Sequence, residues 1–135
     1  MADEKKQVLY IDDEPEMIEL VRLILGRKGY QVSGANCGRD GLTAMRQELP
    51  DLVLLDLMMP DMDGWEVYQQ MKADEITREI PVIVLTAKAQ SIDKVLGLHI
   101  AKVDGYISKP FGSQDLIENV DRVIAEQEKI GPKPN

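Results

Sequence analysis

Three carboxylates of this chain follow directly on apolar segments. Asp12 and Asp13 come after residues 7–11, and Asp56 comes after residues 52–55. An ionised carboxylate is costly to remove from water, so at the end of a core segment it needs a partner that compensates its charge. Three carboxylates in one pocket repel one another, and a divalent cation that prefers oxygen ligands, such as Mg²⁺, would hold them together. These acids therefore predict a metal site if the fold brings them to one place.

Two further apolar segments lead to polar groups of another kind. Residues 80–85 precede Thr86, and residues 103–107 lie shortly before Lys109. Taken alone, Thr86 is an ordinary residue for a strand end and Lys109 an ordinary solvated lysine. Beside the three acids, however, the hydroxyl and the ammonium would place donors on one side of a charged oxygen group and the metal on the other. Together these residues predict a site for such a group.

Short apolar segments alternate with longer segments of helical periodicity, which predicts how these residues are positioned. We expect strands at Gln7–Ile11, Tyr30–Ala35, Leu52–Asp56, Ile80–Leu85 and Val103–Ile107. We expect helices from Pro15 to Gly29, from Gly41 to Glu48, from Trp65 to Ala73, from Ser91 to His99, and from a Ser113 cap onward. Five strands alternating with five helices predict an α/β fold, a doubly wound parallel sheet with helices on two faces. Ligands of such sheets bind beyond the carboxyl ends of the strands, which is where the polar groups above would gather.

Composition excludes several classes of protein. The chain has 135 residues and a formal net charge of −8, which suits one domain and does not suit binding to nucleic acid or anionic lipid through a general positive field. No segment approaches the roughly 20 apolar residues that span a bilayer, and the first residues lack the apolar block of a signal peptide. Cys37 is the only cysteine, so we expect no disulfide framework and a cytoplasmic location.

Four motifs carry a family resemblance. They read YIDDEP, LVLLDLMMPDMDG, IPVIVLTAKA and DGYISKPF, and they occur in this order between roughly residues 6 and 126. With these motifs the chain resembles the receiver domain of two-component response regulators, in particular single-domain members similar to the chemotaxis regulators. The resemblance implies a flavodoxin-like sheet with the strand order 2-1-3-4-5. It also implies a receiver domain over residues 1–126 and a C-terminal tail over residues 127–135.

The resemblance implies a role for each acid. Asp56 would be the phosphoacceptor. Asp13 and Asp56 would bind Mg²⁺ or Mn²⁺ directly, Asp12 would act mostly through a metal-bound water, and the backbone carbonyl of Met58 would complete the protein ligands. Phosphoryl transfer needs positioning and charge neutralisation more than covalent help from the protein, and an acidic metal site supplies both.

The resemblance also implies roles for the polar groups of the last two strands. Lys109 would contact the phosphoryl oxygens, and the peptide bond between Lys109 and Pro110 would be cis. Thr86 would turn its hydroxyl toward the phosphoryl group, and Tyr106 would pack into the space that Thr86 leaves. Thr86 and Tyr106 would thus form a switch pair.

The expected function is a phosphorylation-activated switch that catalyses only its own metal-dependent phosphorylation and dephosphorylation. A sensor histidine kinase would donate the phosphoryl group from a phosphohistidine. We expect no output domain after residue 126, and we therefore expect the signal to pass by contact with a protein target, without direct nucleic-acid binding or membrane insertion. The chain would act as a monomer or a phosphorylation-dependent dimer. The alternative is a receiver domain that belongs to a multidomain response regulator or a hybrid histidine kinase.

Three other functions are less consistent with the residues. A flavodoxin-like FMN-binding protein holds phosphate after its first strand, where the acids at 12–14 would repel it. A haloacid-dehalogenase-type phosphatase shares the aspartate nucleophile and Mg²⁺, but the acids at 61–64 lie too far beyond the strand end and are better interpreted as turn formers. An interaction module that has lost signalling is disfavoured because all the expected site residues are present.

Overall fold

The computed structural model describes residues 5–60, 62–87 and 103–130 of the chain. Its strands form a parallel sheet in the order β2-β1-β3-β4-β5, as predicted. The strands are β1 (Gln7–Ile11), β2 (Gln31–Ala35), β3 (Leu52–Asp56), β4 (Val82–Ala87) and β5 (Gly105–Lys109). The helices are α1 (Pro15–Gly26), α2 (Gly38–Glu48), α3 (Gly64–Ala73) and α5 (Ser113–Ile130). The described residues thus contain four helices, and the helix predicted at Ser91–His99 lies outside them.

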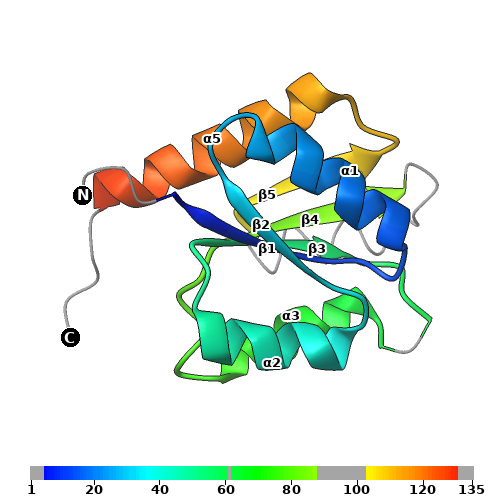
Figure 1. The fold of residues 1–135 in the computed structure, drawn as a ribbon. Helices are drawn as coiled ribbons and strands as arrows, with labels where there is room; N and C mark the ends of the chain where they lie inside the picture. The colour runs from blue at the N-terminus through cyan, green and yellow to red at the C-terminus, as the bar shows by residue number, and fades with distance from the viewer. Residues whose placement is uncertain (1–4, 61, 88–102, 131–135) are drawn as a thin grey trace.

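Helices cover both faces of the sheet: α1 and α5 lie on one face, and α2 and α3 lie on the other (Figure 1). Successive side chains of a strand point to opposite faces, so each strand contributes to two core layers. In β1, Val8 and Tyr10 pack in the layer of α1 and α5, whereas Leu9 and Ile11 pack in the layer of α2 and α3. Burial on both faces explains why the strands read as unbroken apolar runs.

The second helix begins earlier than its sequence predicts. We expected a start at Gly41, but α2 begins at Gly38, and the preceding Cys37 side chain accepts a hydrogen bond from the backbone N–H of Asp40. Cysteine is not among the preferred N-cap residues, so the sequence carried no usual start signal. Gly41 lies inside the helix, where a Cβ atom would lie 2.4 Å from Cδ1 of Ile11. Close packing on β1, and not a helix start, therefore accounts for this glycine.

The last two strands lie two residues later in the sequence than predicted. We expected Ile80–Leu85 and Val103–Ile107, and the structure has Val82–Ala87 and Gly105–Lys109. Asp104 explains the difference, because its backbone N–H donates to the Val82 carbonyl at 3.0 Å and its carboxylate accepts from the Val82 N–H at 2.8 Å. These bonds align the starts of β4 and β5, and the strands then extend to Ala87 and Lys109, so that Thr86 lies within β4.

The ends of two helices also differ from the prediction. The first turn of α5 closes with a bond of 3.2 Å from the Leu116 N–H to the Gly112 carbonyl, so Gly112, and not Ser113, holds the capping position. The same helix continues to Ile130 and so includes part of the expected tail at 127–135. The first helix, α1, is shorter than predicted: it ends at Gly26, three residues before Gly29, where we expected it to end. Gly29 adopts a φ of 93°.

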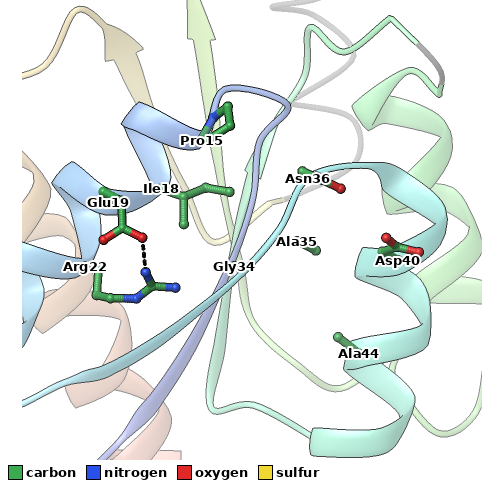
Figure 2. Close-up of a pocket in the computed structure, with 9 residues that line it drawn as sticks. All are labelled: Pro15, Ile18, Glu19, Arg22, Gly34, Ala35, Asn36, Asp40 and Ala44. Atoms are coloured by element: carbon green, nitrogen blue, oxygen red, sulfur yellow. Dashed lines mark hydrogen bonds and ion pairs between the residues drawn. The ribbon is translucent and has the colours of Figure 1, made fainter.

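A pocket of about 390 Å³ lies between α1 and α2 beside the edge strand β2 (Figure 2). Its lining includes none of the predicted site residues. Arg22 pairs with Glu19 there and donates through Nε to the Val32 carbonyl at 3.3 Å. This contact covers one of the backbone groups that an edge strand leaves open. None of the helices among the described residues has the length and apolar character that crossing a membrane requires.

Candidate functional site

The carboxyl ends of β1 and β3 bring the predicted acids together. The two strands pair in parallel with Ile11 opposite Leu55, so the residues that follow share one edge of the sheet. One carboxylate oxygen from each of Asp12, Asp13 and Asp56 lies within 4.8 Å of the others. The sheet therefore places these acids as the strand order predicts.

Asp12 is fully buried, and its carboxylate is held by three donors. Oδ2 accepts a hydrogen bond from the Tyr10 hydroxyl and contacts Nζ of Lys109 at 3.1 Å, while Oδ1 accepts from the Glu14 backbone N–H at 2.9 Å. Burial, the hydrogen bond to Asp12 and the nearby negative charges raise the pKa of Tyr10 far above its ordinary value. Tyr10 therefore remains a protonated donor at any physiological pH.

Asp56 is nearly as buried, with 3% of its surface exposed. Its Oδ1 accepts from the Met58 backbone N–H at 3.1 Å, and its Oδ2 lies 3.4 Å from Nζ of Lys109. Burial raises the pKa of Asp56 from 3.8 to about 6, although the Met58 N–H and Lys109 act in the opposite direction and Asp12 adds to the rise. At neutral pH the carboxylate is ionised but poorly solvated, which suits a nucleophile.

Lys109 bridges the two buried carboxylates from the end of β5. Its ammonium forms ion pairs with both Asp12 and Asp56. Burial alone would lower the pKa of Lys109, but the charges of Asp56 and Asp12 outweigh it and raise the pKa above 10.5. The ammonium therefore stays charged, and the peptide bond between Lys109 and Pro110 is cis, as the resemblance implied.

Thr86 and Tyr106 belong to one face of the sheet. In the pairing of β4 with β5, Tyr106 lies opposite Val84, so both side chains point to the same face of the sheet. Thr86 is two residues after Val84 and therefore also has this parity, that is, it points to the same face. Val84 packs in the layer of α2 and α3. Asp56 has the opposite parity, because it pairs with Leu85, in the layer of α1 and α5. Thr86 is buried, whereas Tyr106 is 53% exposed. Inward packing of Tyr106 is not present in this structure and stays a prediction for the phosphorylated state.

The turn after β3 packs against the backbone of the phosphoacceptor candidate. Asp63 caps α3 by accepting from the Trp65 N–H at 2.9 Å, in agreement with its interpretation as a turn former. A Cβ atom on Gly64 would lie 2.2 Å from the Asp56 carbonyl oxygen and 2.7 Å from Cα of Leu57. The sequence indicated a turn at this glycine but not its contact with Asp56.

Tyr10 is the residue of this site that the sequence analysis missed. It stands inside an apolar run, where a tyrosine is usually a core residue. A signal was nevertheless present, because Tyr10 precedes Asp12 by two residues and alternation puts both on the same face of the sheet. A buried tyrosine hydroxyl usually finds a partner, and Asp12 is the acceptor within reach.

The donor set fits a hard divalent cation. Asp12, Asp13 and Asp56 offer carboxylate oxygens close to one another, and oxygen ligands of this kind suit Mg²⁺ or Mn²⁺ better than metals that prefer sulfur or imidazole. Met58 donates its N–H to Asp56 within the same turn. The part of Met58 in metal binding, through its carbonyl, stays a prediction.

Asp13→Asn should stabilise the metal-free protein by about 1 kcal/mol and weaken Mg²⁺ binding. The substitution removes one of three like charges that lie within 4.8 Å of one another, and it also removes a metal ligand. Thermal unfolding with a chelator and a Mg²⁺ titration would measure the two effects. Asp40→Asn is the control, because Asp40 lies in the first turn of α2, where its charge is favourable. An unchanged or lower melting temperature for metal-free Asp13→Asn would contradict the prediction.

Comparison with known proteins gives consistent matches along the chain. The family model described as the response regulator receiver domain matches residues 8–121. The alkaline phosphatase synthesis transcriptional regulatory protein PhoP of Bacillus subtilis (strain 168) is 36% identical over 127 residues, which are 94% of this chain and 52% of that protein. This chain spans about half the length of the curated relatives it matches.

Solved structures share the fold over nearly all of both chains. A CheY-like response regulator receiver domain protein from Methanospirillum hungatei JF-1 superimposes with a TM-score of 0.85 at 31% identity, covering 95% of this chain and 100% of the other. The signal receiver domain of a signal transduction histidine kinase from Syntrophus aciditrophicus gives a TM-score of 0.83 at 29% identity, covering 96% and 98%. The similarity therefore extends over the sheet and the strand ends that carry the acidic cluster.

Proposed function

This chain belongs to the response regulator receiver domain family, and from that membership we propose that Asp56 is the side chain through which it works as a phosphoacceptor. Receiver domains are the phosphoacceptor signalling switches of two-component systems. The observation that carries the proposal for Asp56 is its environment. It is a buried carboxylate 3.4 Å from the Lys109 ammonium and beside two further acids.

In the proposed reaction an oxygen of the Asp56 carboxylate attacks the phosphorus atom of a phosphohistidine. The new P–O bond forms as the P–N bond breaks, and the released histidine nitrogen takes up a proton from solvent. Lys109 compensates charge on the transferred phosphoryl oxygens, because its ammonium already lies beside Asp56. Asp13, Asp56 and the Met58 carbonyl would hold Mg²⁺ or Mn²⁺ directly, and Asp12 would act mostly through a water. The cation would supply further positive charge to the transfer.

Phosphorylation of Asp56 adds charge at one point of the sheet edge, roughly −1.5 to −2 for a phosphoryl group. Thr86 then donates its hydroxyl to the new anion, and Tyr106 packs into the vacated space. This is a local change of charge that biases a two-state element. The surface that responds includes β5, α5 and the predicted helix at Ser91–His99.

The partners in this proposal are a sensor histidine kinase as donor and a protein as target. The chain catalyses its own phosphorylation and dephosphorylation, in the cytoplasm, as a monomer or a phosphorylation-dependent dimer. We propose that residues 1–126 form the receiver domain and that residues 127–135 follow as a C-terminal tail, of which residues 127–130 continue α5. A second candidate is a receiver domain within a larger regulator or a hybrid kinase. Two relatives support this candidate: PhoP, described as a transcriptional regulatory protein, of which this chain covers 52%, and the structure described as the receiver domain of a histidine kinase.

Acetyl phosphate tests the proposal without knowledge of the kinase. With Mg²⁺, intact mass spectrometry should show the addition of one phosphoryl group, and peptide mapping after borohydride reduction should place it on Asp56. A chelator should prevent the labelling. A label on another side chain, or none under these conditions, would contradict the proposed function. Steady release of phosphate from small esters would instead favour the phosphatase alternative.

A further inference from the structure

Tyr10 provides a neutral hydrogen-bond donor to a buried charge. Its ring is fully buried in the layer of α1 and α5, and its hydroxyl donates to Oδ2 of Asp12. Asp12 has no exposed surface, and the donors that the structure gives its carboxylate are Tyr10, Lys109 and the Glu14 backbone N–H. The tyrosine therefore does more than fill space in the core: it satisfies one of the carboxylates of the acidic cluster.

The same oxygen of Asp12 is shared with Lys109. Nζ of Lys109 lies 3.1 Å from Asp12 Oδ2 and 3.4 Å from Asp56 Oδ2. The ammonium thus has two competing partners, and the closer one is Asp12. A phosphoryl group bound on Asp56 would compete with Asp12 for this ammonium. If Lys109 turned to the phosphoryl group, the buried oxygen of Asp12 would lose a donor, and the desolvation cost of that oxygen would oppose the change of partner.

We propose that Tyr10 is a positioning residue that satisfies Asp12 when Lys109 turns to the phosphoryl group, an inference that rests on the proposed phosphorylation of Asp56. Because the tyrosine already donates to Oδ2, this oxygen keeps a partner after the ammonium moves. The hydroxyl also takes up part of the acceptor capacity of Oδ2, so it weakens the hold of Asp12 on Lys109. Tyr10 therefore acts on the transfer step through Asp12 and Lys109, without contact to the phosphoryl group.

Tyr10→Phe removes the hydroxyl and keeps the ring. The maximal rate of phosphorylation by acetyl phosphate at saturating Mg²⁺ should fall roughly tenfold, the effect of losing one hydrogen bond to a charged group. The Mg²⁺ dissociation constant should stay near that of the wild type, because Lys109 still compensates Asp12 before transfer. A variant that merely disorders the site would lose metal affinity and rate together.

Tyr30→Phe is the matched control. Tyr30 also donates its hydroxyl to an aspartate, Asp121, but this pair lies on the surface of α5. Its removal should leave both the rate and the metal affinity unchanged. A wild-type rate for Tyr10→Phe, or a parallel loss of rate and Mg²⁺ affinity, would overturn the role of Tyr10. A wild-type protein that acetyl phosphate does not label would overturn the proposed function itself, so the two failures are distinguishable.

A measurement on the unmodified protein covers the case in which Tyr10→Phe does not fold. The hydroxyl proton of Tyr10 is buried against a carboxylate and should resonate far downfield in the proton NMR spectrum. Phosphorylation with excess acetyl phosphate should move it further downfield, because Tyr10 becomes the main donor to Oδ2 as Lys109 leaves. The absence of this additional shift in fully phosphorylated protein would overturn the inference.

Discussion

Asp56→Asn should abolish labelling by acetyl phosphate and should stabilise the metal-free protein at neutral pH. An amide does not provide the anionic oxygen that attacks phosphorus, so labelling should fall below detection. Asp51→Asn is the matched control. Asp51 precedes β3 at its opposite end, is exposed, and accepts a hydrogen bond from the Gln7 N–H, a bond that an asparagine oxygen also accepts. This control should label as the wild type does.

The gain in stability follows from the raised pKa of Asp56. The pKa is about 6 in the folded protein against an ordinary 3.8, so between these values the folded state holds the proton more strongly than the unfolded chain. Stability therefore falls as the pH rises through this window. One pKa unit corresponds to 1.36 kcal/mol, so the loss amounts to about 3 kcal/mol by pH 7.

Urea unfolding with a chelator at pH 4 and pH 7 measures this effect. The wild type should lose stability between the two pH values relative to Asp56→Asn, and the variant should be more stable by about 3 kcal/mol at pH 7. At pH 4 the two proteins should be similar. If Asp56→Asn is no more stable than the wild type at pH 7, or is more stable by the same amount at both pH values, the charge of Asp56 does not destabilise the fold.

Gly64→Ala should destabilise the fold by about 3 kcal/mol. The added Cβ atom would lie 2.2 Å from the Asp56 carbonyl oxygen and 2.7 Å from Cα of Leu57. Both obstacles are backbone atoms of a central strand and its exit, so they do not move aside as a flexible side chain would. The start of α3 or the end of β3 has to shift, and phosphorylation should fall together with stability.

Gly26→Ala provides the control for Gly64→Ala. Gly26 is the last residue of α1, and a Cβ atom there would meet nothing within 4 Å. Alanine should be neutral there or add up to about 1 kcal/mol, because it favours the helix. Urea unfolding of the three proteins gives the comparison. Equal stability of Gly64→Ala and the wild type would mean that the turn does not press on Asp56.

The parts of this fold that the sequence predicted are those set by apolar periodicity. Residues 8–11 and 52–55 are uninterrupted apolar runs that an acid follows, and β1 and β3 have the predicted bounds, 7–11 and 52–56. Parallel order then requires Asp12 and Asp56 to meet. The predicted bounds of β4 and β5 were two residues too early. The starts of these strands depend on the bonds between Asp104 and Val82, a long-range pairing that local hydrophobicity does not encode.

The parts that the sequence did not predict depend on unusual choices of residue. Cys37 at the start of α2 replaces a recognisable cap. From its sequence context Tyr10 is expected to be a core aromatic residue, but its hydroxyl donates a hydrogen bond to Asp12. Gly64 is expected to be a turn residue, but glycine is needed there because a Cβ atom would clash with the Asp56 backbone. The Cys37 and Tyr10 contacts are with residues three and two positions away in the sequence, but they involve residue types that are seldom expected in these roles. Only the contact of Gly64 with Asp56 joins two separate segments, and it becomes visible only in the folded chain.

The opposite parities of Asp56 and Tyr106 have a consequence for how a message crosses this domain. The proposed phosphoryl group on Asp56 and the side chain of Tyr106 would therefore belong to opposite faces of the sheet. Adjacent residues of a strand point to opposite faces, so Leu85 and Thr86 connect the two faces at the end of β4. A change of charge at Asp56 would thus reach Tyr106 through the backbone of β4.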